Sequence, residues 1–212
     1  MSLSQPTASA SFHGVVETTT NALRLIHAAR LGVIPRICRR LNPAERETLV
    51  KSGSVFVFCV EESRICRWTD GLLWSPSRIL GNFLVYHEIS ERTVHLGRKK
   101  LVLPHQPSRV SARSLTQLGN SFTAIAAFQA GELSTLRPNG LIKKTFSVAI
   151  KGSNLHLISY CTSTDQQSGK FKRPTTSPDI MNLPMDPRLF KGTKFRVPLP
   201  VEKAPDGTYR LV

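Results

Sequence analysis

The chain has no hydrophobic run long enough to cross a membrane. Its longest unbroken apolar run, Val55–Val60, has six residues, whereas a membrane-spanning helix needs roughly 20. The first residues, Met1–Pro6, also lack a basic stretch followed by an apolar one, so no secretory signal is readable. We therefore expect an intracellular chain without a membrane partner.

Cysteine is scarce, with four residues in 212, and no two of them are spaced as C-x-x-C. None of the six histidines is spaced to complete a zinc site. In a reducing compartment such cysteines remain thiols, and we interpret them as small, mostly buried apolar side chains. We expect no metal and no cofactor.

The sequence also lacks the common enzyme motifs. It contains no phosphate-binding G-x-x-x-x-G-K-[ST], no G-x-G-x-x-G, no G-x-S-x-G and no H-E-x-x-H. Its fourteen carboxylates are scattered, and Glu61-Glu62 is the only adjacent pair, whereas two-metal nucleases need several convergent carboxylates. We expect a protein that is not an enzyme and has no small-molecule substrate.

Acidic residues are few in comparison with basic ones. Fourteen Asp and Glu stand against 29 Lys and Arg, which gives a formal charge of +15. Residues 1–90 hold ten basic and seven acidic residues, and residues 91–212 hold nineteen and seven. Such an excess favours a polyanionic partner, nucleic acid before a membrane surface, because phosphate neutralisation releases counterions.

Two classes of nucleic-acid binder remain open from charge alone. The first binds double-stranded DNA, and the second is an RNA-binding or ribosome-associated basic module that stacks unpaired bases on aromatic side chains. Aromatic residues make up 7% of the chain, without a ladder of interleaved aromatics. This composition argues against the RNA alternative.

The first 60 residues predict two helices and a strand. Thr18, Thr19 or Thr20 can cap a helix that Gly32 ends, and Asn42 begins a capping box that is followed by a helix ending at Gly53. Ser54–Val60 is uniformly apolar and rich in β-branched and aromatic residues, which indicates a strand buried on both faces.

The rest of the chain predicts strands separated by irregular segments. Ile79–Glu88 reads as one strand with Gly81 at a bulge or close approach, and residues 140–161 read as a hairpin. Residues 91–139 read as a linker with one or two helical turns near Phe122–Phe128. Seven of the 14 prolines fall in the last 43 residues, which favours a short helical piece near Ser177–Leu183 and otherwise an extended tail.

One short stretch combines arginine, tryptophan and hydroxyl side chains. Arginine can enter a narrow A·T minor groove, and Ser and Thr hydroxyls bond phosphates without reading sequence. The composition also fits a structural turn, in which the tryptophans cap a core edge and the arginines pair with Glu61, Glu62 and Asp70. The residues leave both interpretations open, and both can hold together. The stretch comprises Arg64, Arg67, Trp68, Thr69, Trp74, Ser75, Ser77 and Arg78.

Six segments carry a family resemblance. In chain order they are Lys51–Phe58, Arg67–Gly71, Trp74–Ile79, Phe83–Tyr86, Gly140–Thr145 and His156–Tyr160. The first four resemble the first region of the WOPR domain, found in fungal regulators of morphology and pathogenesis, and the last two resemble its second region.

The resemblance implies an α+β fold. In one globular domain, residues 12–190, a first region (12–90) and a second region (140–190) would interdigitate into a mostly antiparallel β-sheet with short flanking helices. The linker would be 91–139 and the Pro-rich tail 191–212.

The resemblance also implies function. The chain would be a nuclear, sequence-specific regulator of transcription that binds double-stranded DNA and controls fungal morphology or development. The sheet would be tilted into the major groove, and the arginine before W-T-D-G, here Arg67, would enter the minor groove of an A/T-rich site. Beside Arg67, Arg64 and Trp68, the residues expected to position the DNA backbone or face the major groove are Lys51, Thr69, Ser75, Ser77, Arg78, Lys143 and Lys144.

The chain departs from the family pattern just before this tryptophan. The family commonly has G-I-K-R, whereas this chain reads Arg64-Ile65-Cys66-Arg67. A glycine and a lysine are therefore replaced, and Arg64 either restores the lost positive charge or stiffens the loop.

Overall fold

The computed structural model describes residues 8–96, 99–103, 133–203, 207 and 209–211. The chain divides into two compact units. One consists of residues 1–70, 77–86 and 141–212, and the other of residues 71–76 and 87–140. Each unit is described separately below.

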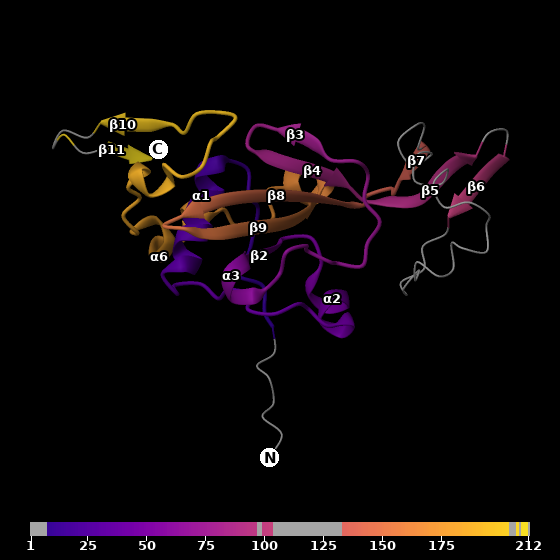
Figure 1. Cartoon of the computed structure of the whole chain (residues 1–212), viewed down its shortest axis with the longest axis horizontal. Coiled ribbons are helices and arrows are strands. Elements are labelled where there is room, and N and C mark those ends of the chain that lie inside the picture. Colours follow the sequence, from indigo (N-terminus) through magenta and orange to yellow (C-terminus); the bar gives the residue numbers. More distant parts are fainter. Residues whose placement is uncertain (1–7, 97–98, 104–132, 204–206, 208, 212) are drawn as a thin grey trace, which may run out of the picture. The chain divides into compact units, whose positions relative to one another are not determined.

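The first unit is built on a six-stranded antiparallel sheet in the order β1-β2-β9-β8-β4-β3 (Figure 1). The hairpin of β8 and β9, from the second sequence region, lies between β2 and β4 of the first region. This arrangement confirms that the two regions share one sheet. The strands are β1 (Phe12–His13), β2 (Ser54–Cys59), β3 (Arg78–Leu80), β4 (Phe83–His87), β8 (Leu141–Ile150) and β9 (Ser153–Thr162).

The predicted helices of the first region are present. Helix α1 (Thr19–Arg30) begins where the Thr18 side chain accepts a hydrogen bond from the Asn21 backbone N–H. Helix α2 (Pro43–Leu49) carries the full capping box of Asn42 and Glu45, but it ends at Leu49, before the predicted Gly53.

The main core lies on one face of the sheet. Apolar residues of α1 pack with alternate residues of β2 and β9, and Ile180 of α6 (Pro178–Met181) and Phe190 of η3 (Pro187–Phe190) complete the cluster. The alternating residues of β2 and β9 that point away from α1, such as Phe56 and Tyr160, face the opposite side of the sheet and are also buried. Strand β2 is therefore buried along its whole length, as its uniformly apolar sequence predicts. The remaining short helices of this unit are α3 (Val60–Ser63), α5 (Ser163–Gln167) and η2 (Pro174–Thr176).

The segment 79–88 forms a hairpin instead of the single strand predicted. Strands β3 and β4 pair from Leu80↔Phe83 outward. Gly81 has a φ of 58°, and a Cβ built on it would meet nothing within 4 Å. Gly81 therefore supplies the left-handed backbone of a tight turn, and the expectation of a bulge or close approach was wrong.

The second unit contains strands where a linker was predicted for residues 91–139. Its described part forms a three-stranded antiparallel sheet in the order β6-β5-β7. For these described residues an irregular linker was therefore the wrong prediction, and their Thr and Val content suits strands. The predicted helical turns at Phe122–Phe128 lie outside the described residues. The strands are β5 (Ile89–Leu96), β6 (Lys99–Leu103) and β7 (Leu133–Leu136).

The Pro-rich tail is more ordered than predicted. The short helix α6 confirms the helical piece, but β10 (Val201–Lys203) and β11 (Tyr209–Leu211) then form an antiparallel hairpin. Leu211 is buried within the core cluster, so the tail is attached to the domain by apolar packing.

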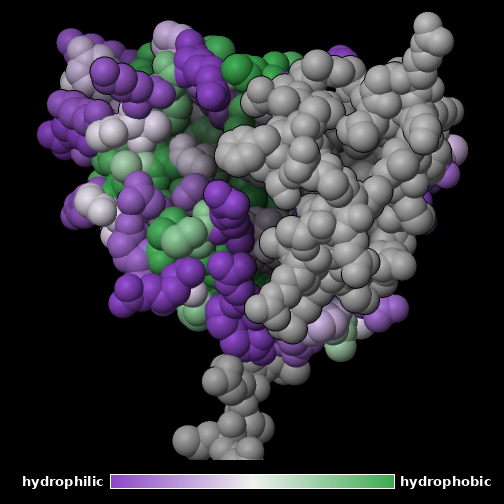
Figure 2. Space-filling view, turned by 45° about the vertical axis from the view of Figure 1, so that its right-hand side comes forward, coloured by the Kyte–Doolittle hydropathy of each residue, from purple (hydrophilic) through white to green (hydrophobic). Residues whose placement is uncertain are grey.

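The described surface is mostly hydrophilic on the face that Figure 2 shows, where purple residues surround smaller green areas. Large apolar side chains are nevertheless exposed on β3, where Ile79 and Leu80 are 63% and 61% exposed. None of the helices described is long and apolar enough to span a membrane.

The Glu45 carboxylate makes the stability of this fold depend on pH. Hydrogen bonds from Arg39, and then from the backbone N–H of Asn42, hold the pKa of Glu45 at about 2, below its ordinary 4.5. The folded state thus binds fewer protons than the unfolded state, and the stabilisation present above pH 4.5 is lost as the pH falls towards 2.

We predict that Glu45→Gln lowers the free energy of unfolding at pH 7 by about 1–3 kcal/mol, because charged hydrogen bonds are lost. The difference from wild type should narrow between pH 4.5 and 3, as measured by urea unfolding. Glu47→Gln, at an exposed position of the same helix, is the control and should change little. A difference in unfolding free energy between wild type and Glu45→Gln that stays constant with pH contradicts the prediction.

Candidate functional site

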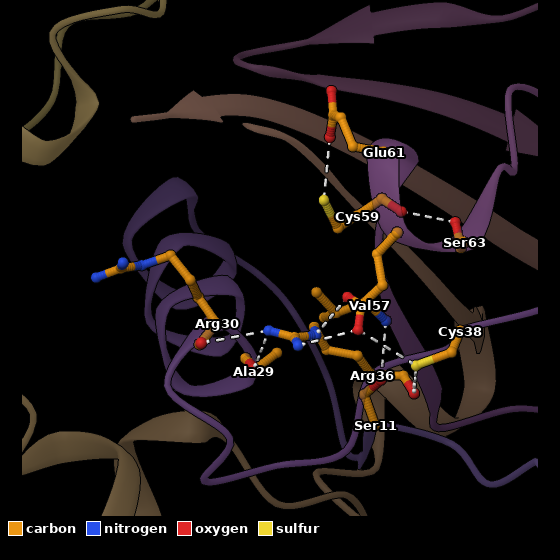
Figure 3. Close-up of polar contacts among 10 residues, drawn as sticks. Ser11, Ala29, Arg30, Arg36, Cys38, Val57, Cys59, Glu61 and Ser63 are labelled. Atoms are coloured by element: carbon orange, nitrogen blue, oxygen red, sulfur yellow. Dashed lines mark hydrogen bonds and ion pairs between the residues drawn. The ribbon is translucent and has the colours of Figure 1, made fainter. Parts of the chain in front are cut away.

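The segment from Arg64 to Asp70 carries four of the expected functional residues and is fixed at its start. Helix α3 ends at Ser63, and Arg64 follows in the left-handed conformation with φ 57° and ψ 22°. The Ser63 hydroxyl donates to the Cys59 carbonyl at 2.6 Å (Figure 3) and accepts from the Ile65 N–H at 3.2 Å. Ile65 is 1% exposed. The basic loop, residues 64–70, therefore leaves α3 in one defined direction.

Trp68 anchors the middle of the basic loop to the sheet. Its ring stacks on Phe58 at 5.6 Å between centroids and lies 5.1 Å from Phe56. Its indole Nε1 donates to the Tyr160 hydroxyl at 2.7 Å. His156 stacks on the same Phe58 ring. Trp68 thus joins a row of aromatic side chains on the sheet face opposite α1.

Asp70 anchors the end of the basic loop through buried polar contacts. Its Oδ2 accepts from the Tyr160 hydroxyl at 2.7 Å and from the Lys143 ammonium at 3.0 Å. Burial, helped by Asp70, raises the pKa of the Tyr160 hydroxyl well above its usual value. Burial lowers the pKa of the Lys143 ammonium, and Asp70 opposes that shift. Tyr160 therefore remains a neutral hydroxyl that donates to Asp70 and accepts from Trp68.

Between these anchors the arginines are exposed and available. Arg64, Arg67 and Thr69 are all exposed. Within the described residues, neither arginine side chain has a carboxylate partner. The two interpretations of this stretch therefore hold together, because Trp68 is packed while the arginines face outward.

The nearby carboxylates are engaged elsewhere. Glu62 pairs with Arg36 at 3.0 Å. Glu61 accepts from the Cys59 thiol at 3.0 Å (Figure 3) and from the Asn154 amide. Hydrogen bonds, that from Cys59 first, lower the pKa of Glu61 to about 2. Both carboxylates are therefore held by partners other than the loop arginines.

The other expected residues of the first region lie outside this loop in sequence and divide between the two units. Ser77, Arg78 and Lys51 are exposed in the first unit, whereas Ser75 belongs to the second unit, where it accepts from the His87 N–H at 3.0 Å. Trp74 also lies in the second unit and is 8% exposed.

The two lysines of β8 are not surface cations. Lys143 is 8% exposed and pairs with Asp70. Lys144 is half-buried, and its ammonium donates to the Val16 carbonyl at 3.2 Å. Since both ammonium groups already have partners inside the chain, the structure places neither where an external phosphate would meet it first.

Sequence reasoning missed the residues that hold the loop. The sequence places Tyr160 in a predicted hairpin and a family segment, and Asp70 in a family segment or as an arginine partner, without assigning either a role in holding the loop. One signal pointed to Tyr160, because a tyrosine in a buried strand needs a partner for its hydroxyl. Nothing in the sequence identified that partner.

No group of three or more histidine, cysteine or carboxylate side chains among the described residues could hold a metal ion. Residues 11–162 match the family model described as the Gti1/Pac2 family, and the chain belongs to that family. It is a family of transcription regulators and not of enzymes.

Curated relatives match most of the chain. The "Global transcription regulator FGP1" of Gibberella zeae is 35% identical over 214 residues, which is 90% of this chain and 62% of that protein. The "cAMP-independent regulatory protein pac2" of Schizosaccharomyces pombe is 37% identical over 164 residues, 71% of this chain and 69% of that protein. The chain thus spans about two-thirds of the length of these relatives.

A solved structure is also similar. It is the complex of the WOPR domain of Wor1 from Candida albicans with a 17-bp double-stranded DNA. That chain has 31% sequence identity and a TM-score of 0.57, and the match covers 86% of this chain and 97% of that one.

Tyr160 is the centre of the loop's attachment. We predict that Tyr160→Phe lowers the free energy of unfolding by about 1–3 kcal/mol, since Trp68 and Asp70 each lose a hydrogen bond. Urea unfolding followed by circular dichroism measures this. Tyr86→Phe is the matched control, because the Tyr86 ring lies 5.0 Å from the Lys143 ammonium and the substitution keeps that ring. Equal losses in the two variants would contradict the assigned role of the Tyr160 hydroxyl.

Proposed function

We propose that the chain is a sequence-specific, double-stranded DNA-binding regulator of transcription that acts in the nucleus. Arg67 enters the minor groove of an A/T-rich site, and the sheet lies towards the major groove. The regulated processes are fungal morphology or development.

The observation that carries this proposal is the exposed guanidinium of Arg67, which has no carboxylate partner among the described residues and lies on a loop held at both ends. An arginine in a narrow A·T minor groove meets a deep negative potential, and no guanine amino group obstructs it. Because Trp68 and Asp70 already fix the neighbouring backbone, less conformational entropy is lost when Arg67 binds. The clamp therefore favours insertion of this one side chain.

The other candidate residues divide into two roles. Trp68 and Lys143 act as positioning residues, because their polar atoms bond Tyr160 and Asp70. The remaining residues are proposed as contacts to phosphates or groove edges. Lys144 and Ser75 are less available for such contacts, because Lys144 already donates to the Val16 carbonyl and Ser75 already accepts from the His87 N–H. The exposed members of this second group are Lys51, Arg64, Thr69, Ser77 and Arg78.

The overall charge supplies affinity that does not depend on sequence. A chain with 29 basic and 14 acidic residues attracts any polyanion, and this attraction falls steeply with salt. Specificity must then come from a few residues that contact the grooves. The similar Wor1 domain in complex with DNA, and the relatives named as transcription regulators, support this assignment.

We predict that Arg67→Ala loses about 1–3 kcal/mol of binding to an A/T-rich site selected from random duplex DNA. Fluorescence anisotropy titration of labelled duplex measures the loss. Arg40→Ala, which removes one exposed arginine elsewhere, is the charge control and should bind nearly as wild type.

Two results would count against the proposal. The first is equal affinity of Arg67→Ala and wild type for the selected duplex. The second is displacement of the duplex by single-stranded RNA at lower concentration than by unlabelled duplex, which would favour an RNA-binding module.

A further inference from the structure

Arg64 has a backbone conformation that suits glycine better than arginine. Three non-glycine residues among those described have positive φ, namely Arg64, Asn139 and Lys151. Asparagine tolerates this region well, and Lys151 lies in the tight turn between β8 and β9, where positive φ is required. Arg64 lies instead at the end of a helix, a position that glycine commonly fills.

The surroundings of Arg64 impose this conformation. Its N–H donates to the Val60 carbonyl at 2.9 Å, which closes the last turn of α3. Ser63 and the buried Ile65 fix the backbone on either side. The backbone at Arg64 is therefore determined by its neighbours and not by its own side chain.

Arg36 strengthens this constraint from outside the loop. Its guanidinium donates to the Ala29 and Arg30 carbonyls at the end of α1 and pairs with Glu62 of α3 (Figure 3). Helix α3 is thus tied to α1, which packs on the sheet. Relaxation of Arg64 would have to move α3 against these contacts.

The Arg64 side chain gains nothing from the fold in return. It is exposed, and no hydrogen bond, ion pair or ring contact of its guanidinium exists among the described residues. By comparison, the Arg36 guanidinium has four polar contacts, two with backbone carbonyls of α1 and two with the Glu62 carboxylate. A strained, unpartnered arginine is explained if its side chain acts on something outside the chain.

We propose that Arg64 binds a DNA phosphate beside the groove that Arg67 enters, so that this chain gains sequence-independent affinity at the expense of fold stability. The inference rests on the proposed function and adds to it. Three residues span at most about 10 Å of chain, and the minor groove is only about 6 Å wide. The phosphates that border the groove are therefore within reach of the second guanidinium, which can contact one of them with two parallel N–H groups.

Three variants of Arg64 separate its backbone from its side chain. Arg64→Gly should raise Tm by about 2–4 °C, because glycine adopts positive φ without strain. It should also weaken binding about 3- to 10-fold, on A/T-rich and unrelated duplexes alike, and lower the salt slope of log K by about 1. Arg64→Ala should lose the same affinity without the gain in Tm. Arg64→Lys should keep most of the affinity, since it keeps the charge.

Lys151→Gly is the matched control. It relieves the same left-handed conformation and removes the same charge from another exposed position. Like Arg64→Gly it should raise Tm, but it should leave the DNA affinity near that of wild type. If Lys151→Gly weakens binding as much as Arg64→Gly, net charge explains the loss and the proposal is overturned.

Arg67→Ala, titrated in parallel, distinguishes failure of this inference from failure of the proposed function. If Arg67→Ala binds weakly while Arg64→Ala matches wild type, the phosphate contact is wrong and the function stands. If neither variant changes binding, both are wrong. A Tm of Arg64→Gly at or below that of Arg64→Ala would overturn the claim of backbone strain.

Discussion

The buried hydrogen bonds of Tyr160 hold together the parts of the molecule on which everything else depends. Tyr160 comes from β9 of the second sequence region, while its partners Trp68 and Asp70 come from the first. One hydroxyl therefore bonds two residues of the basic loop, and it does so only when the two regions have formed a common sheet. The first region holds the loop through Ser63 and the stacking of Trp68 on Phe58, but its polar anchors are complete only when the two regions have paired.

Local sequence signals predicted the local structure well. The capping box of Asn42 and Glu45, the Thr18 cap and the buried strand at Ser54 each follow from chemistry within a few residues, and each is present. Gly81 shows the limit of such signals. A glycine in a strand-like run fits a bulge or a turn equally well, and only the pairing of β3 with β4 decides between them.

The exposed side chains of the candidate site could be predicted from the sequence, but the buried contacts that hold them could not. Arginines beside a tryptophan are visible in the sequence, but the pairing of Lys143 with Asp70 joins residues 73 positions apart. Distance in sequence also explains why β7 was missed, because its partner β5 lies far from it in the chain. It does not explain β5 and β6, which pair with each other as near as Leu96 with Lys99 and carried a local signal that was interpreted as a linker.

The charges around the basic loop show how a nearly neutral stretch can present cations. Residues 61–90 hold three arginines and four carboxylates. Three of those carboxylates, Glu62, Asp70 and Glu88, pair with Arg36, Lys143 and Arg137 from elsewhere in the chain. Glu61 is occupied by Cys59 and Asn154. The fold thus neutralises the acidic side chains of the stretch, while its own arginines have no carboxylate partner in the part of the chain that the structure describes. A sum of charges over the sequence cannot reveal this.

The placement of the β8–β9 hairpin between β2 and β4 also affects how the length of the connection between the two regions can change. The polypeptide that connects β4 to β8 enters and leaves the sheet at neighbouring strands, so it closes a loop whose ends are already held by pairing. The entropy of closing such a loop grows only with the logarithm of its length, and doubling it costs about 0.6 kcal/mol. Since this connection also carries the sheet of β5, β6 and β7, the logarithmic cost applies to lengthening outside those strands, which the six-stranded sheet can accommodate at little free-energy cost.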